Sequence, residues 1–473
     1  MQAVVRLAGS VRALFIPTTT KAARRAAVVA EAVEGRVLFS TYTVTNVNDS
    51  GAGSLRDAIG QANATTATDT IEFRIGTGLK TIWAKAGMVV KNPVVLNATT
   101  QGGYAGKPLI EIRGDYAGAT TNALTFYNGN TTVSGLIVNR FGGTGMMFIS
   151  GNNYTVRNCY VGTDAWGNAA APNKGHGILV QTSYNTIGGL TAADRNVISG
   201  NGANGIQLYN PGSTNNKVIG NYIGTNAAGT AAVGNASGVQ VWSAKYNTIG
   251  GTTAAARNVL GGNRADGVII NGAGATNNVV SGNYIGTNAA GTGRLGNGDY
   301  GVEISQAWNT VGGAVAGAGN VISGNGKSGV ALWLSSCNNC QVLGNYIGTD
   351  NTGARAMPNA WNGVDVTNGA SYNRVGGSTA AERNVISGNA GDGVMMYQGT
   401  GNAVVNNTIG LNAARTAGLG NTKNGIAVYY VTNASLTGNL IGHNGGSAIF
   451  KNTTSTNVTN AGNTITNDTI FWF

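Results

Sequence analysis

Glu303 and Asp365 are the residues best suited to acid–base chemistry, because each places a carboxyl group at the same position of a recurring glycine motif. The motif is a Gly followed by alternating apolar residues, as in GVEI and GVDV. Paired carboxyl groups can protonate a glycosidic oxygen and activate water, which is the chemistry of glycosidases. Lys327 stands just before GVAL, the copy of the motif between GVEI and GVDV. It could instead accept a proton, as a β-eliminating lyase requires. Such a lyase would need Ca²⁺ or Arg to neutralise a uronate carboxylate, and no other cofactor or metal is expected.

Two aspartates and a tryptophan extend this candidate site. Asp299 stands two residues before one motif glycine, and Asp392 stands directly before another. If the motifs stack, these groups lie on neighbouring segments with the carboxyl pair and the lysine, beside Trp333. The alternative is a solvated patch without a chemical task, which is the usual state of surface charges. The sequence alone leaves both interpretations open.

Aromatic side chains recur at the fourth position after the motif glycine. Alternate residues of a strand face opposite sides, so the second and fourth positions are predicted to face solvent. Five of the eight fourth positions are aromatic. Rings spaced along one face can stack on sugar rings, although exposed sheet faces favour aromatic residues in any case. The predicted ligand-binding aromatic residues are Tyr209, Trp242, Trp333, Tyr397 and Tyr429.

The elements that would position these residues follow from the repeat spacing. In the segments NCYVGTD, NYIGTN, NYIGTN, NYIGTD and NTIGLN the glycines stand at 162, 224, 286, 348 and 410, so each step is 62 residues. The shorter glycine motif occurs twice in each unit. Such a repeat predicts coils of three short strands that stack into three parallel sheets around a Val, Ile and Leu core. We therefore predict an all-β chain forming a right-handed parallel β-helix of about ten or eleven coils.

Composition supports an elongated β protein and narrows the partners. The 473 residues include 76 Gly and only 6 Pro, and 42% are hydrophobic, which is enough to fill a long core. The formal net charge of +11 favours an acidic polysaccharide or another anionic cell-surface glycan. No Lys/Arg-rich run marks a nucleic-acid site, and no apolar segment has the length of a membrane span. The oligomeric state is not predicted.

Recurrent asparagines and three cysteines are expected to serve the scaffold. Gly and Asn tolerate left-handed backbone at bends. We expect two sets to stack across alternate coils as amide ladders. The sets are Asn201, Asn263, Asn325 and Asn389, and Asn221, Asn283 and Asn345. Cys159 replaces an asparagine of the second set, while Cys337 and Cys340 are either a local disulfide or two free thiols, without partners for a metal site.

The units RNVISGN, NYIGTN and NTIGG resemble the repeats of bacterial right-handed parallel β-helix proteins with the pectate-lyase superfamily fold. Residues 42–63, YTVTNVNDSGAGSLRDAIGQAN, resemble the opening of large secreted bacterial β-helix proteins, which implies a first strand and a capping helix with Ser54 as its N-cap. The expected organisation is an export leader at 1–41, an N-terminal cap and first coils at 42–130, repeats at 131–450 and a C-terminal cap or tail at 451–473. The resemblance implies a secreted or cell-surface location in a bacterium.

Two classes of function remain after these observations. The first is a structural or adhesive surface protein that binds polysaccharide through the aromatic and polar face. The second is a polysaccharide lyase or glycoside hydrolase acting on acidic polysaccharide, with Glu303, Asp365 and Lys327 as catalytic groups. Regular repeats with few ionisable residues favour the first class. Convergence of these three side chains in one groove would favour the second.

Overall fold

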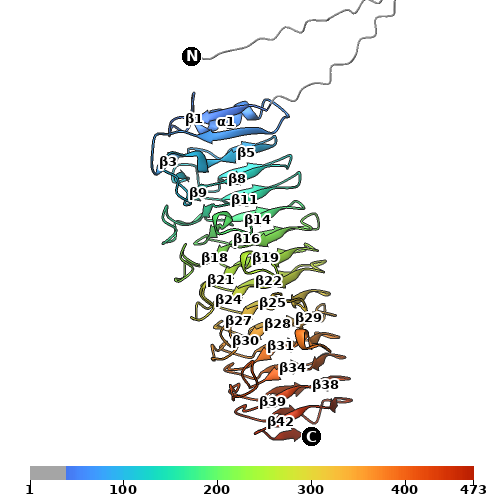
Figure 1. Ribbon diagram of the computed structural model, residues 1–473. Coiled ribbons are helices and arrows are strands. Elements are labelled where there is room, and N and C mark those ends of the chain that lie inside the picture. The colour runs from blue at the N-terminus through green and yellow to red at the C-terminus, as the bar shows by residue number, and fades with distance from the viewer. Residues whose placement is uncertain (1–38) are drawn as a thin grey trace, which may run out of the picture. The chain divides into compact units, whose positions relative to one another are not determined.

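Strands stack into three parallel sheets of 15, 14 and 14 strands in the computed structural model, which describes residues 39–473 (Figure 1). The leader expected at 1–41 therefore lies almost entirely outside the described residues. The first sheet runs from β1 (Thr41–Val44) to β41 (Thr459–Ala461), the second from β4 (Met88–Val90) to β43 (Ile470–Trp472), and the third from β3 (Lys80–Trp83) to β42 (Thr464–Thr466). The predicted parallel β-helix is confirmed.

Each coil gives one strand to each sheet. The coil that begins with β19 continues through β20 (Thr248–Gly250) to β21 (Val259–Leu260), and the next coil begins with β22. The predicted glycine motifs start the strands of the second sheet. These strands are β16 (Ile206–Tyr209), β19 (Val239–Trp242), β22 (Val268–Asn271), β25 (Val302–Ile304), β28 (Val330–Trp333), β31 (Val364–Thr367), β34 (Val394–Tyr397) and β37 (Ile426–Tyr429).

Sheets of 14 or 15 strands exceed the ten or eleven coils that the motif spacing predicts. The additional coils at the start contain strands such as β5 (Val94–Asn97) and β8 (Thr132–Ser134), which lack the glycine motif. At the other end, β40 (Ile449–Lys451) and β43 extend the second sheet. The sheets therefore run without interruption through the expected boundaries at 130 and 450.

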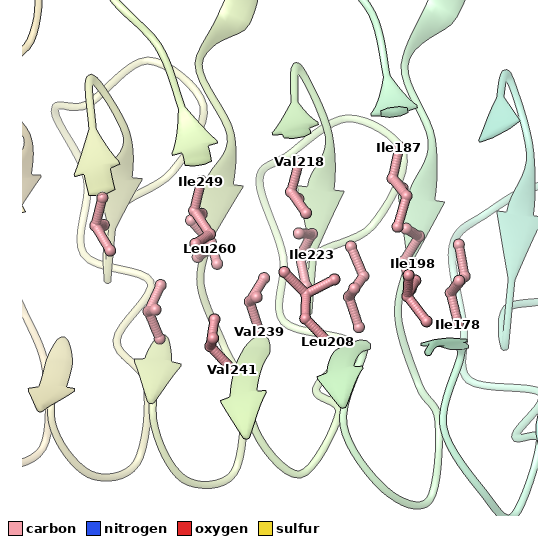
Figure 2. Close-up of a cluster of buried hydrophobic side chains, with 14 of the residues drawn as sticks. Ile178, Ile187, Ile198, Leu208, Val218, Ile223, Val239, Val241, Ile249 and Leu260 are labelled. Carbon is pink, nitrogen blue, oxygen red and sulfur yellow. The ribbon is translucent and has the colours of Figure 1, made fainter. Parts of the chain in front are cut away.

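The core is built by alternation along the short strands. Val239, Val241, Ile249 and Leu260, from three sheets of one coil, are fully buried and point toward one another (Figure 2). Burying such a side chain contributes about 1.5–3 kcal/mol. Because the next coil repeats the same pattern, the coils share one continuous hydrophobic core.

A short helix covers the N-terminal end of this core. The helix α1 (Leu55–Ala62) buries Leu55, Ala58, Ile59 and Ala62 and packs against β1, β2 (Asp69–Phe73) and β4. Ser54 is the N-cap, and its hydroxyl accepts a hydrogen bond from the amide of Asp57 at 3.2 Å. The Asp57 carboxylate accepts from the Gly53 amide, one residue before the N-cap. No helix in residues 39–473 is long and apolar enough to cross a membrane.

Asparagine ladders run along the axis, but through every coil rather than through alternate coils. Asn235 lies between Asn201 and Asn263, and its side chain bonds to both at 2.9 and 3.1 Å. The ladder residues are buried, do not adopt left-handed φ, and bridge neighbouring coils with their side-chain amides. Left-handed φ occurs instead at other asparagines, such as exposed Asn215 and Asn277, and at residues of other types.

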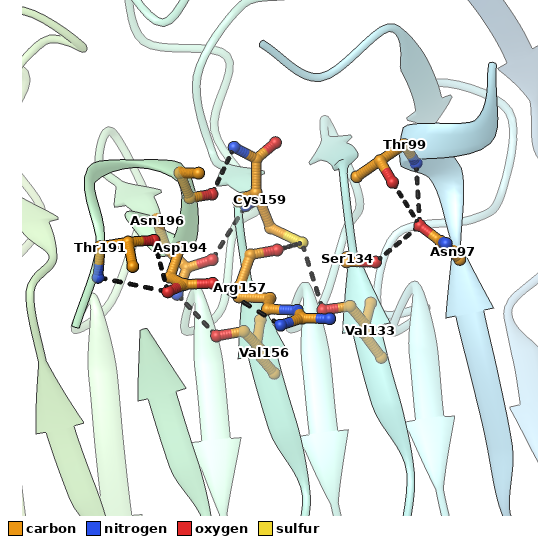
Figure 3. A network of polar contacts seen from close by, with 12 residues as sticks. Asn97, Thr99, Val133, Ser134, Val156, Arg157, Cys159, Thr191, Asp194 and Asn196 are labelled. Carbon is orange, nitrogen blue, oxygen red and sulfur yellow. Dashed lines mark hydrogen bonds and ion pairs between the residues drawn. The ribbon is translucent and has the colours of Figure 1, made fainter. Parts of the chain in front are cut away.

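Two of the three cysteines, Cys159 and Cys340, take the places of asparagines in these ladders. The amide of Cys159 donates to Asn196 Oδ1 at 2.9 Å, and Asn196 Nδ2 donates to the Val156 carbonyl (Figure 3). Cys337 and Cys340 are buried free thiols with their sulfur atoms 3.7 Å apart. Of the two predicted alternatives, the structure contains the free thiols.

Candidate functional site

The structure places the two predicted catalytic carboxyl groups in one row of the second sheet. Glu303 on β25 pairs with Ala331 on β28, which pairs with Asp365 on β31. Two strand spacings separate the acidic residues, which amounts to about 9.6 Å between backbones. Their surroundings differ greatly, and this difference decides what each can do.

Asp365 is buried, although the alternation pattern predicts that it faces solvent. Only 6% of the residue is exposed, and both carboxylate oxygens accept hydrogen bonds, from Ser328 Oγ at 2.5 Å and from Asn362 Nδ2 at 2.6 Å. Burial raises the pKa of this carboxyl group, while the two hydrogen bonds oppose the rise. Asp365 therefore anchors a polar network that joins neighbouring coils.

Asp392 has a similar structural role. It is buried, and its Oδ1 accepts hydrogen bonds from both the backbone and the side-chain amide of Asn424, each at 2.8 Å. The expectation that Asp392 contacts a ligand is not supported by this geometry, because the carboxylate bonds to the next coil. Its position, directly before the motif glycine, is one where polar side chains cap the following coil.

Lys327 lies beside two aromatic rings that contact each other. Its Nζ is 2.9 Å from Asp299 Oδ1, and it lies 5.0 Å from the ring centroid of Tyr300 and 5.6 Å from that of Trp361. The two rings meet edge to face at 6.2 Å. Two cation–π contacts and an ion pair thus engage the ammonium group. To accept a proton from a substrate, this lysine would first have to leave these contacts.

Asp266 is an acidic residue of this cluster that the sequence interpretation missed. It lies directly before the motif glycine of β22, is 5% exposed, and accepts a hydrogen bond from the Tyr300 amide at 3.1 Å. Burial raises its pKa to about 7, and the charge of Glu303 adds to the rise. Burial also raises the pKa of Glu303, with Lys327 opposing. The equivalence with Asp392 in sequence was the signal that could have identified Asp266.

Tyr300 lies near several of these carboxyl groups. Burial, followed by the charges of Asp365, Glu303, Asp299 and Asp266, raises the pKa of its phenol to about 12. The phenol therefore stays protonated near neutral pH and can donate a hydrogen bond. The excess of carboxyl groups also makes this part of the surface unfavourable for an anionic ligand.

The predicted aromatic row is interrupted, and its last member, Tyr429, is half-buried against Phe450. Tyr209 and Trp242 are partners on adjacent strands and are 39% and 41% exposed. Asn271 and the buried Ser305 separate this pair from a second group. The second group contains Trp333, Tyr397 and Tyr429, with Thr367 between the first two.

No family model and no curated protein sequence matches the chain. Among solved structures, it resembles the A-module of the mannuronan C-5 epimerase AlgE6 from Azotobacter vinelandii, with 15% identity, a TM-score of 0.44 and coverage of 90% of this chain and 99% of that one. The periplasmic alginate epimerase AlgG matches with 12% identity and a TM-score of 0.43, over 90% of this chain and 85% of that one. The Dettilon tailspike protein matches with 12% identity and a TM-score of 0.40, over 89% of this chain and 64% of that one. The fold assignment for this chain rests on its own sheet topology.

A surface hollow of about 250 Å³ adjoins the cluster. It is lined by Ala360, Trp361, Asn362, Ala390, Gly391 and Lys423. Trp361 is 49% exposed, so one aromatic side chain contacts Lys327 and also borders the hollow. Within residues 39–473, no group of three or more His, Cys, Asp or Glu side chains is arranged to hold a metal ion.

Proposed function

We propose that this protein is an exported or cell-surface β-helix that binds polysaccharide through the second sheet. The observation that carries the proposal is the exposure of aromatic rings at the strand ends of this sheet, with Tyr209 and Trp242 in register on adjacent coils. Flat rings with a polar edge suit the apolar faces of sugars and tolerate exposure to water. The export assignment rests on the resemblance of residues 42–63 to secreted β-helix proteins.

Binding without catalysis suits the observed cluster better than the predicted catalytic set does. Asp365 and Asp392 use their carboxylates to cap neighbouring coils, and Lys327 is held by Asp299 and two rings. A lyase with Lys327 as base, and any role for Ca²⁺ beside it, would require these contacts to break. The carboxyl groups also favour a neutral stretch of glycan at this point of the sheet.

Glycoside hydrolysis is the second candidate, and one specific observation favours it. Asp266 lies two residues before β22, and Glu303 lies on the adjacent strand β25. Burial raises the pKa of Asp266 to about 7. A carboxyl group with a pKa of about 7 is partly protonated at neutral pH and can act as a general acid, while a second carboxylate serves as nucleophile or base. This pair replaces the predicted pair of Glu303 and Asp365.

Binding and turnover assays on matched variants test the proposal. Trp333→Ala and Tyr397→Ala should each weaken binding to a polysaccharide by about fivefold, since one ring stacking contact is worth about 1 kcal/mol. The melting temperature should stay unchanged, because these rings lie outside the core. Thr367→Ala, between the two rings, is the control. Product release that disappears in Asp266→Asn or Glu303→Gln would instead establish the hydrolase.

A further inference from the structure

A second set of exposed aromatic residues lies on the turns that lead from the second sheet to the first. Its members directly precede the repeated NTIGG-type segment, and all four have left-handed backbone. They are Tyr184, Tyr246, Trp308 and Tyr372, with φ of 59°, 60°, 61° and 56°. Between 51% and 60% of each residue is exposed. We call these four residues the turn row.

The turn row alternates with asparagine from coil to coil. Asn215, Asn277 and Asn339 occupy the corresponding turns of the intervening coils, with φ of 56°, 57° and 55°. Backbone hydrogen bonds link neighbouring turns: the Tyr246 amide donates to the Thr276 carbonyl at 3.1 Å, and the Asn277 amide donates to the Trp308 carbonyl at 3.1 Å. Successive rings therefore lie two coils apart, which amounts to about 9.6 Å.

The fold does not explain the aromatic members. Left-handed φ is unfavourable for bulky side chains and is tolerated by asparagine, which meets the same backbone requirement in the intervening coils. The rings contribute little to the core because they are exposed. The Tyr372 ring lies against Gly401 of the next coil, so closely that a Cβ atom on Gly401 would be 2.5 Å from its Cδ1. Because Tyr372 is 59% exposed, the opposite face of the ring is open to solvent.

The charge around the turn row is positive. The seven turns that carry these positions, from 181–185 to 368–373, contain no Asp or Glu. Lys245 lies in one of the turns, 5.6 Å from the Tyr246 ring centroid, and exposed Lys217 begins the strand after another. Arg374 begins a third strand and pairs with Glu382 at 3.7 Å. This surface therefore suits an anionic ligand, unlike the carboxyl-rich cluster on the second sheet.

We propose that the turn row is a second glycan-binding surface, specific for an extended acidic polysaccharide. The ring spacing is close to the length of two pyranose units in an extended chain, so each ring would stack on every second sugar. Lys245 beside the Tyr246 ring, and Lys217 after the Asn215 turn, would attract the uronate or sulfate groups in between. This inference rests on the proposed glycan-binding role. It adds a second binding site, an acidic polymer as its ligand, and a spacing of one ring for every two sugars.

The chain supplies its own conservative replacement for the test. In a variant carrying Tyr184→Asn, Tyr246→Asn, Trp308→Asn and Tyr372→Asn, every turn holds the residue that the neighbouring coils already use. The melting temperature should be unchanged or higher. Binding to polygalacturonate, measured by calorimetry, should weaken at least about tenfold, because up to four stacking contacts are lost. For the unmodified protein, affinity for galacturonate oligomers should rise in steps of two sugar units.

Two controls separate this inference from the proposed function. Trp166 is 67% exposed and lies outside the turn row, and the next 62-residue unit has Ala228 at the equivalent position. Trp166→Ala should therefore bind polygalacturonate as the unmodified protein does.

If the fourfold variant binds polygalacturonate normally while Trp333→Ala loses polysaccharide binding, the turn row is not a glycan site and the proposed function stands. If the unmodified protein binds neither polygalacturonate nor a neutral β-glucan, both proposals fail. Self-association lost in the fourfold variant would assign the row to contacts between copies and overturn this inference.

Discussion

Replacing Asp266 with Asn should change how stability depends on pH. The pKa of Asp266 is about 7 in the folded protein, against a usual value of 3.8, because the carboxyl group is buried near Glu303. A raised folded-state pKa contributes stability that is fully present below pH 4 and is lost as the pH rises through 7. A difference of about 3 pH units corresponds to about 4 kcal/mol, so this amount of stability should be lost between pH 4 and pH 8.

The side chain introduced by Asp266→Asn would keep an oxygen for the Tyr300 amide but would carry no charge. We therefore expect this variant to match the unmodified protein at pH 4 and to exceed it by up to about 4 kcal/mol at pH 8 in urea melts. Asp164→Asn is the matched control, because Asn226 occupies the equivalent turn and accepts the same type of backbone hydrogen bond. An equal pH dependence in Asp266→Asn and the unmodified protein would refute the assigned burial and charge of this carboxyl group.

Three further predictions concern the scaffold and the turns. Val239→Asp should lower the free energy of unfolding by several kcal/mol, about the cost of burying an unpaired charge, whereas Gln240→Ala should cost only about 1–2 kcal/mol through the lost hydrogen bonds to Asn204, Gln207 and Asn271; equal losses in urea melts would show that the strand register is wrong. Asn258→Ala should cost about 2–4 kcal/mol because it leaves the Val218 carbonyl and the Asn221 amide without their side-chain partner, and an unchanged urea midpoint would contradict the ladder. Tyr246→Asn should keep or raise the melting temperature by relieving left-handed strain, and a fall of several degrees would mean that the ring stabilises the fold.

The fold could be predicted from the repeat because most coils contain the same short sequence pattern. The glycine at the start of GVQV and the alternation of Val239 and Val241 specify an inward-facing strand without reference to the rest of the chain. Stacking then follows from the constant 62-residue step. The additional coils at the two ends of the sheets, such as those that contain β5 and β43, lack the glycine motif, so the motif spacing did not count them.

The candidate site was harder to predict because its contacts join different coils. One carboxylate oxygen of Asp365 accepts a hydrogen bond from Ser328, 37 residues away in the sequence. The GVDV motif itself does not predict this contact. Likewise, the ladder between Asn201 and Asn263 is completed by Asn235, from a segment that does not share their motif. The turn row was present in the sequence as the residue before NTIGG, but only φ and exposure distinguish it from an ordinary turn.

The most direct test of the proposed function is a crystal structure of the protein soaked with a neutral oligosaccharide that it binds in solution. Polysaccharide binding by the second sheet predicts intact sugar rings stacked on the exposed faces of Trp333, Tyr397 or Trp242. A neutral oligosaccharide bound elsewhere, or a cleaved product held between Asp266 and Glu303, would contradict the account.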